Sequence, residues 1–107
     1  MTMEATFTVL AEPARRQILD LLRERERTVN ELVELTGMSQ PSVSKHLRVL
    51  REAGLVEVRQ DAQRRWYRLQ AQPLAEIESW LAPYRAFWTG RLDALERFLQ
   101  EKEKNGR

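Results

Sequence analysis

The sequence predicts a mainly α-helical domain with one small β-hairpin, in the arrangement called a winged helix-turn-helix. Three features predict it: two helical segments separated only by a short turn at residues 37–39, two alternating strands after the second segment, and a long amphipathic stretch near the C-terminus. With 107 residues and 42% hydrophobic content, the chain has enough apolar material for one core. We therefore expect one domain over residues 1–107, with a core at 12–70 and C-terminal helices at 73–100.

The first two helices are predicted from apolar spacing and from a proline. Residues 4–11 form a short helix in this prediction. Pro13 begins a second helix that runs to about residue 25, because proline has no N–H to lose in a first turn. The second helix turns one face inward, since apolar residues recur along it at helical spacing: Ala14, Ile18, Leu21 and Leu22.

The third and fourth helices are predicted from their caps. Thr28, with Glu31 three residues later, forms a capping box that begins a third helix of about eight residues. The Ser39 hydroxyl caps a fourth helix over residues 40–53. A glycine follows each helix and is able to take the left-handed conformation that ends it. The two helices and the turn between them form a helix-turn-helix candidate.

The fourth helix divides into an apolar stripe and a small, polar, basic face. Val43, Leu47 and Leu50 fall at i, i+4 and i+7, so they pack inward. The other face suits a recognition helix in a major groove, because serines let the backbone approach DNA while Gln, Lys and Arg reach phosphates or base edges. Its candidate DNA-binding residues are Gln40, Ser42, Ser44, Lys45, His46 and Arg48.

Two strands follow at residues 55–60 and 65–69, where apolar and charged residues alternate around a polar tip of four residues. After a recognition helix such a hairpin forms a wing, and Arg64 and Arg65 are placed to meet the DNA backbone or minor groove. Residues 40–68 hold seven Lys or Arg against three acids, whereas the whole chain has a net charge of only +2. Two alternatives to DNA binding stay open. The basic residues of this region form an ordinary solvated charged face, or the arginine pair belongs to an exposed turn that only keeps the protein soluble.

The segment from Pro73 onward carries a wide aromatic stripe in steps of three and four residues. Such a stripe exceeds what one small core covers, so we expect a homodimer interface. Its predicted contact residues are Leu81, Tyr84, Trp88, Leu92, Leu95 and Leu99. Pro83 should break or kink the segment into a short helix and a long one. Two alternatives stay open: the aromatics pack on their own domain, or they line a ligand pocket between subunits, formed by Trp80, Tyr84, Phe87 and Trp88.

Several other classes of protein are disfavoured. The chain has no cysteine, so it forms no disulfide and no thiolate metal site. No run approaches the roughly 18 apolar residues of a membrane span, and residues 1–10 lack a secretion signal, so we expect a cytoplasmic protein. We expect neither an enzyme nor a bound cofactor, because no glycine-rich phosphate loop or nucleophile motif is visible and the single histidine lacks an acid partner.

Three runs of residues carry a resemblance to a known family: LAEPARRQIL at 10–19, SQPSVSKHLRVL at 39–50 and AGLV at 53–56. Over about residues 10–69 the chain resembles the ArsR/SmtB family of bacterial winged-helix repressors. The resemblance implies a homodimer, held by the first and last helices, that binds double-stranded DNA at an inverted-repeat operator and blocks transcription. By position, the family's groove-facing and wing residues are matched by Gln40, Ser42, Ser44 and Lys45, with His46 beside them, and by Arg64 and Arg65.

The chain departs from the metal-sensing members of this family. Where some carry cysteines in the third helix, it has only ELVEL, and where others carry paired Asp and His ligands on the last helix, its one histidine lies on the fourth. It therefore resembles the branch without metal sites, and its small-molecule effector stays unknown. The alternatives are a protein-binding module, a ligand-responsive regulator, and a carboxylate-only metal site from Glu76, Glu78, Asp93 or Glu96.

Overall fold

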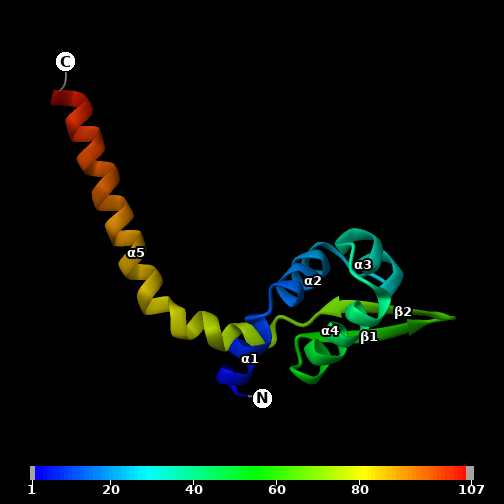
Figure 1. Cartoon of the computed structure of the whole chain (residues 1–107). Helices are drawn as coiled ribbons and strands as arrows, with labels where there is room; N and C mark the ends of the chain where they lie inside the picture. Colours follow the sequence, from blue (N-terminus) through cyan, green and yellow to red (C-terminus); the bar gives the residue numbers. More distant parts are fainter. Residues whose placement is uncertain (1, 106–107) are drawn as a thin grey trace. The chain divides into compact units, whose positions relative to one another are not determined.

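The computed structural model describes residues 2–105 of the chain as a mainly helical protein with one two-stranded antiparallel sheet (Figure 1). This arrangement confirms the predicted fold class. The chain divides into two compact units, Met1–Glu76 and Ile77–Arg107. In chain order its elements are α1 (Met3–Leu10), α2 (Pro13–Glu24), α3 (Val29–Thr36), α4 (Gln40–Glu52), β1 (Val56–Asp61), β2 (Arg64–Leu69) and α5 (Gln72–Asn105).

The helices α3 and α4 begin where the sequence predicts, because the predicted caps form. The Glu31 N–H donates to Thr28 Oγ1 at 3.2 Å, and the Thr28 N–H donates to Glu31 Oε1 at 3.2 Å. Gly37 then ends α3 in the left-handed conformation, with φ 73°. Ser39 caps α4 by accepting a hydrogen bond from the Ser42 N–H at 3.3 Å. The helix-turn-helix is therefore α3, the turn at 37–39, and α4.

The core of the first unit lies among α2, α3, α4 and the hairpin. The apolar stripe predicted on α4 is buried, and these elements pack on one another. Each large aliphatic side chain that leaves water stabilises the fold by about 1.5–3 kcal/mol, so this cluster holds the helix-turn-helix and the wing together. The side chains with at most 1% exposure are Ile18, Leu32, Val43, Leu47, Leu50 and Leu55.

Strands β1 and β2 form the wing, and their pairing runs from Val56 opposite Leu69 to Asp61 opposite Arg64. The loop between them is therefore only residues 62–63, shorter than the predicted four-residue tip. Ala62 has φ 55°, in the left-handed region that tight hairpin loops use and that favours glycine. The wing thus carries its arginines at the very end of the paired strands.

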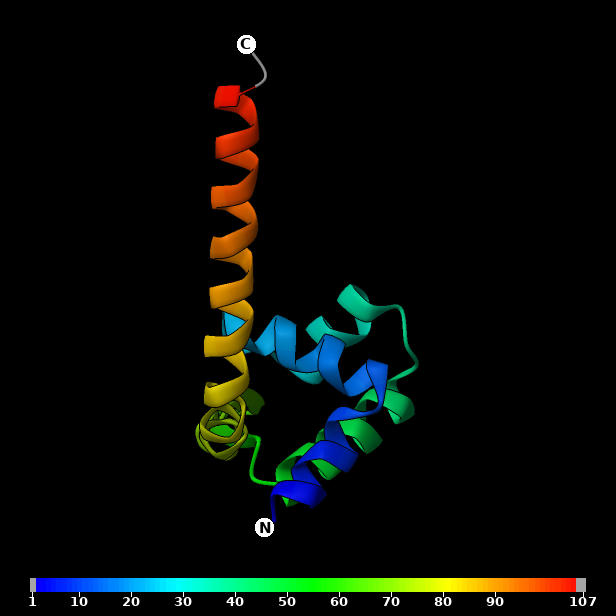
Figure 2. The same cartoon turned by 90° about the vertical axis from the view of Figure 1, so that its left-hand side faces the viewer.

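The helix α5 is continuous from Gln72 to Asn105 with Pro83 inside it, so the prediction of two separate helices is wrong. Proline has no N–H to donate, which removes one hydrogen bond, but the turns on both sides remain helical and hold the segment as one helix. Figures 1 and 2 draw α5 as one continuous helix.

Candidate nucleic-acid interface

The α4 helix sorts its residues into a buried face and an outward face. The apolar stripe is held in the core, so the polar residues of the helix are turned away from it. All six candidate residues of the fourth predicted helix lie on α4 in the structure. Gln40, Lys45 and Arg48 are exposed, whereas Ser42, Ser44 and His46 are half-buried.

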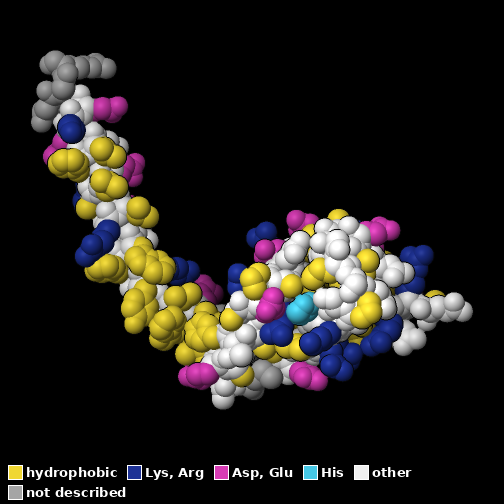
Figure 3. Space-filling view, in the orientation of Figure 1, with side chains coloured by type: hydrophobic (Ala, Val, Ile, Leu, Met, Phe, Trp, Pro, Cys, Tyr) yellow, Lys and Arg dark blue, Asp and Glu magenta, His cyan; other side chains and the backbone are white. Residues whose placement is uncertain are grey.

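His46 differs from its neighbours because one side of its ring is enclosed. Its Nδ1 atom is buried and has no hydrogen-bond partner among the residues the structure describes. The residue as a whole is half-buried, and Figure 3 shows basic side chains gathered on one face of the molecule. A contact from His46 to a ligand therefore has to use Nε2, the other ring nitrogen.

The turn that precedes α4 is fixed by a threonine at the end of α3. Thr36 Oγ1 donates to the Leu32 carbonyl at 2.7 Å and accepts a hydrogen bond from the Met38 N–H at 3.2 Å. The helices α3 and α4 also pack on each other. The first turn of α4 is therefore held in place, and this is the part of a recognition helix that contacts base edges.

The wing arginines lie at the tip of the hairpin, and both are exposed. Because successive residues of a strand point to opposite faces, Arg64 and Arg65 are directed to the two sides of the wing. The Arg65 guanidinium carbon lies 5.8 Å from the centre of the buried Tyr67 ring. The tip therefore presents one cation on each face.

The structure separates the basic residues between 40 and 68 into two groups. Arg59 pairs with Glu26 at 2.8 Å, which holds the pKa of that carboxyl below its ordinary value, and Arg68 pairs with Glu57. The count of seven basic residues in the sequence does not distinguish these two paired arginines from the other five residues. Within the described part of the chain, no ion pair with a carboxylate is formed by Lys45, Arg48, Arg51, Arg64 or Arg65.

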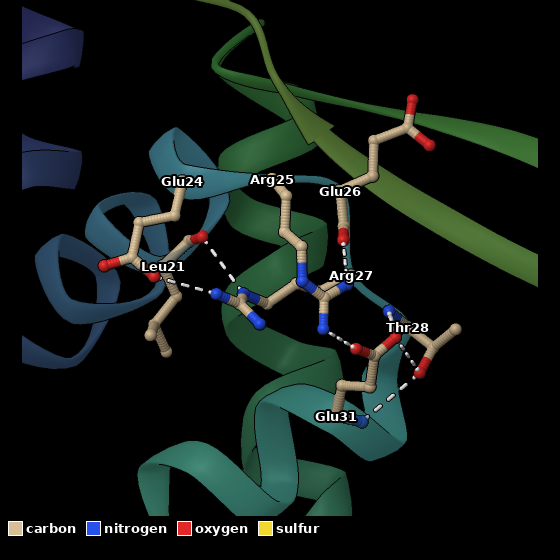
Figure 4. A network of polar contacts seen from close by, with 7 residues as sticks. All are labelled: Leu21, Glu24, Arg25, Glu26, Arg27, Thr28 and Glu31. Atoms are coloured by element: carbon tan, nitrogen blue, oxygen red, sulfur yellow. Dashed lines mark hydrogen bonds and ion pairs between the residues drawn. The ribbon is translucent and has the colours of Figure 1, made fainter.

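A polar network in the segment between α2 and α3 was missed by sequence reasoning (Figure 4). The Arg27 side chain is buried, and its Nε donates to the Leu21 carbonyl at 3.0 Å while Nη2 donates to the Glu24 carboxylate at 2.8 Å. Arg25 reaches Glu31 instead, at 2.5 Å, and this hydrogen bond lowers the pKa of Glu31. Nothing in a run of alternating charges indicates which side chain becomes buried.

The aromatic stripe on α5 is exposed within its own unit, and Figure 3 shows it as a band of apolar side chains along the helix. The rings of Trp80 and Tyr84 lie with their centres 5.2 Å apart. Leu81 is half-buried. The large apolar side chains that are 48% to 65% exposed are Trp80, Tyr84, Phe87, Trp88, Leu92, Leu95, Phe98 and Leu99.

Comparison with known proteins places this arrangement in a family. A family model described as "Bacterial regulatory protein, arsR family" matches residues 12–58. The transcriptional repressor SdpR of Bacillus subtilis is 32% identical over 79 residues, which cover 74% of this chain and 88% of SdpR. The chain belongs to the arsR family. The arsR-family match contains all of α2, α3 and α4 and ends inside the wing.

Other curated relatives of this arsR-family chain are longer than it is. The regulator KmtR of Mycobacterium tuberculosis is 44% identical over 71 residues, which cover 66% of this chain and 55% of KmtR. An uncharacterized regulator of the same organism is 43% identical over 72 residues, with 63% of its length covered. The chain thus spans between half and two thirds of the length of these relatives.

Solved structures of arsR-family proteins share the fold. A possible transcriptional regulator for arsenical resistance has a TM-score of 0.63 at 44% identity, covering 84% of this chain and 91% of that one. The homodimeric winged helix-turn-helix DNA-binding domain of Mb0332 from Mycobacterium bovis has a TM-score of 0.63 at 32% identity, covering 78% and 77%. The winged helix-turn-helix assignment therefore agrees with these structures.

Two further findings concern the part of the arsR-family chain that the structure describes. No group of three or more His, Asp or Glu side chains there is arranged to hold a metal ion, and this includes the α5 carboxylates. None of the described helices combines the length and apolar character needed to cross a bilayer. The arsR family is a family of regulators and not a class of enzymes.

Proposed function

We propose that the chain is a sequence-specific transcriptional regulator that binds double-stranded DNA as a homodimer and represses transcription from an inverted-repeat operator. The observation that carries the proposal is α4, whose Gln40, Lys45 and Arg48 are exposed while its opposite side is held in the core. Membership of the arsR family supports the proposal, and so does SdpR, a relative named as a transcriptional repressor.

In the proposed complex α4 lies in the major groove, with each side chain in a distinct role. Gln40, in the first turn, reads a base edge, and the short side chains of Ser42 and Ser44 allow the backbone to approach. Lys45 and Arg48 have no carboxylate partner in the described part of the chain, so they are available to neutralise phosphates. His46 adds one contact through Nε2.

The wing arginines are proposed to bind the flanks of each half-site. Since Arg64 and Arg65 point to opposite faces of the hairpin, one faces the backbone on each side of an adjacent minor groove. Contacts of this kind are insensitive to sequence, and they supply affinity and orientation more than discrimination.

Two copies are proposed to pair through α5. The exposed stripe supports this, since an apolar surface of such extent on a monomer usually marks an interface, and the homodimeric state of Mb0332 supports it too. A two-fold dimer sets its recognition helices about 34–36 Å apart, in successive major grooves, so the operator is expected to be an imperfect palindrome. The proposed contacts are Leu81, Tyr84, Trp88, Leu92, Leu95 and Leu99.

The proposed mechanism is occupancy of the operator. A bound dimer excludes the transcription machinery without any chemical step, so no catalytic residue, cofactor or metal is assigned. Such a regulator acts in the bacterial cytoplasm, where its DNA lies. In this proposal α4 and the wing supply the binding energy for DNA, and α5 pairs the two copies into a two-fold symmetric dimer.

An electrophoretic mobility shift assay tests the proposal, using the DNA that precedes the chain's own coding sequence, excess random competitor and two salt concentrations. We expect a discrete complex that contains two protomers and survives the competitor. Weak binding that disappears at the higher salt, without sequence preference, would contradict specific regulation. Sedimentation equilibrium that shows a monomer at micromolar concentration would contradict the dimer.

A further inference from the structure

Arg27 carries a charge in a place where charges are rare. Its side chain is 7% exposed, and no other charged side chain in the described part of the chain is buried. Removing a cation from water is costly unless partners replace its hydration. A buried guanidinium in the short segment between α2 and α3 therefore needs an explanation beyond solubility.

The side chain of Arg27 is fixed to the end of α2. Leu21, whose carbonyl accepts from Nε at 3.0 Å, lies in the last turn of that helix, where carbonyl groups have no partner within the helix. The Glu24 carboxylate accepts from Nη2 at 2.8 Å. A cation at a helix C-terminus is also favoured by the helix dipole. The Arg27 side chain thus satisfies a carbonyl at the C-terminal end of α2, two residues beyond the C-cap residue Arg25.

The backbone of the same residue is fixed to the wing. The Arg27 N–H donates to the Tyr67 carbonyl at 3.0 Å, and the Tyr67 N–H donates to the Arg27 carbonyl at 2.8 Å. Beside this bridge, the Glu26 carboxylate pairs with Arg59 of β1 at 2.8 Å. Tyr67 lies two residues from Arg65, on the same strand and the same face.

We propose that Arg27 is a positioning residue, which sets the orientation of the wing relative to the recognition helix. Its backbone is bonded to β2 and its side chain to α2, and α2 packs on α4. The wing arginines are thereby presented at one fixed angle, so that they meet the flanks while α4 is in the groove. The inference rests on the proposed function for its ligand, DNA, although Arg27 itself touches none.

A double-mutant cycle tests this role, with a duplex selected from a random-sequence library by the wild-type protein. We expect Arg27→Met to weaken binding about tenfold, the equivalent of about 1.4 kcal/mol, and to remove hydroxyl-radical protection only at the flanks. Arg25→Met is the matched control, since it removes the same charge from an exposed side chain two residues away, and we expect a loss of less than about threefold.

The energetic coupling between Arg27 and the wing arginines distinguishes a positioning role from a general contribution to stability, because only a positioning role makes the effect of Arg27→Met depend on those arginines. In an Arg64→Ala/Arg65→Ala background, Arg27→Met should cost less than about twofold, because the contacts it positions are already gone. Equal losses in both backgrounds, or a uniformly weakened footprint, would overturn the proposal. Should Arg27→Met not fold, Arg27→Lys enters the same cycle, with an expected loss of about threefold that again vanishes without the wing arginines.

Failure of the proposed function is distinguishable from failure of this inference. If the wild-type protein selects no duplex, regulation by DNA binding is refuted, whereas the positioning role still has a test without DNA. NMR residual dipolar couplings of the wing amides, measured against those of α4, should change in Arg27→Met and stay unchanged in Arg25→Met. Unchanged couplings in both variants would overturn the positioning role.

Discussion

Helices α4 and α5 carry the same kind of pattern, apolar residues in steps of three and four, yet the two stripes have opposite surroundings. On α4 the stripe is at most 1% exposed, because α2, α3 and β1 pack against that helix. On α5 the large apolar residues beyond Ile77 are 48% to 65% exposed, apart from the half-buried Leu81. Periodicity therefore reports that a helix has an apolar face, and the rest of the chain decides whether that face is covered.

The largest expected effect comes from the covered stripe. Leu47→Ala should lower the free energy of unfolding by roughly 2–5 kcal/mol, since it leaves a cavity that the packed helices fill only in part. Urea unfolding followed by circular dichroism measures this. The matched control is Leu95→Ala on α5, studied at concentrations where the chain is monomeric, with an expected change within about 0.5 kcal/mol. Equal losses at both positions would erase the contrast between the helices.

The uncovered stripe should instead determine association. Leu92→Glu places a carboxylate in the proposed dimer interface, and we expect it to weaken the dimer by roughly 2–4 kcal/mol, which is about 30-fold to 1000-fold in the dissociation constant. Sedimentation equilibrium gives that constant. Ala86→Glu is the control, because helical spacing puts the same charge on the opposite face of α5. A dimer insensitive to Leu92→Glu would mean that the stripe has another use.

The features that the sequence predicts correctly are those determined by residues close together in the chain. The starts of α3 and α4 depend on caps within three residues of each other, Thr28 with Glu31 and Ser39 with Ser42, so a short stretch of sequence contains all the information. The recognition face follows for the same reason, because the positions that are buried on α4 repeat within two turns. The starts of both helices and the burial of the α4 stripe agree with the structure, and the DNA-binding role of the outward residues stays a prediction.

Features that depend on distant residues were not predictable in this way. The backbone of the buried Arg27 is bridged to Tyr67, forty positions later, and Arg59 is paired with Glu26 on a different segment. No local pattern identifies such partners, so the count of basic residues could not separate the paired arginines from the unpaired ones. Pro83 shows the converse, since a strong local signal for a helix end is overridden by helical turns on both sides.

A smaller effect is expected at the start of α4, where specificity is proposed to reside. Gln40→Ala should reduce discrimination at one base pair of each half-site by about 1–3 kcal/mol and leave binding to random DNA unchanged. Titration of the selected operator against single-base variants, by fluorescence anisotropy, measures the difference. Gln17→Ala, which removes an exposed glutamine from α2, should alter neither quantity. If Gln40→Ala lowered specific and random affinity equally, its role as a base reader would be wrong.

The smallest expected effect distinguishes a basic residue on α4 from one on α5. Lys45→Ala should weaken binding to every sequence alike and flatten the plot of log affinity against log salt by about one unit for each phosphate that is no longer neutralised. Arg97→Ala removes the same charge from the polar face of α5, so it has the same effect on net charge and should leave the slope unchanged. Long-range attraction would lower both slopes equally, whereas direct binding to a phosphate lowers only the first. The pair of slopes therefore tells whether α4 meets the backbone of DNA directly or whether the basic residues act only through the overall field of the protein.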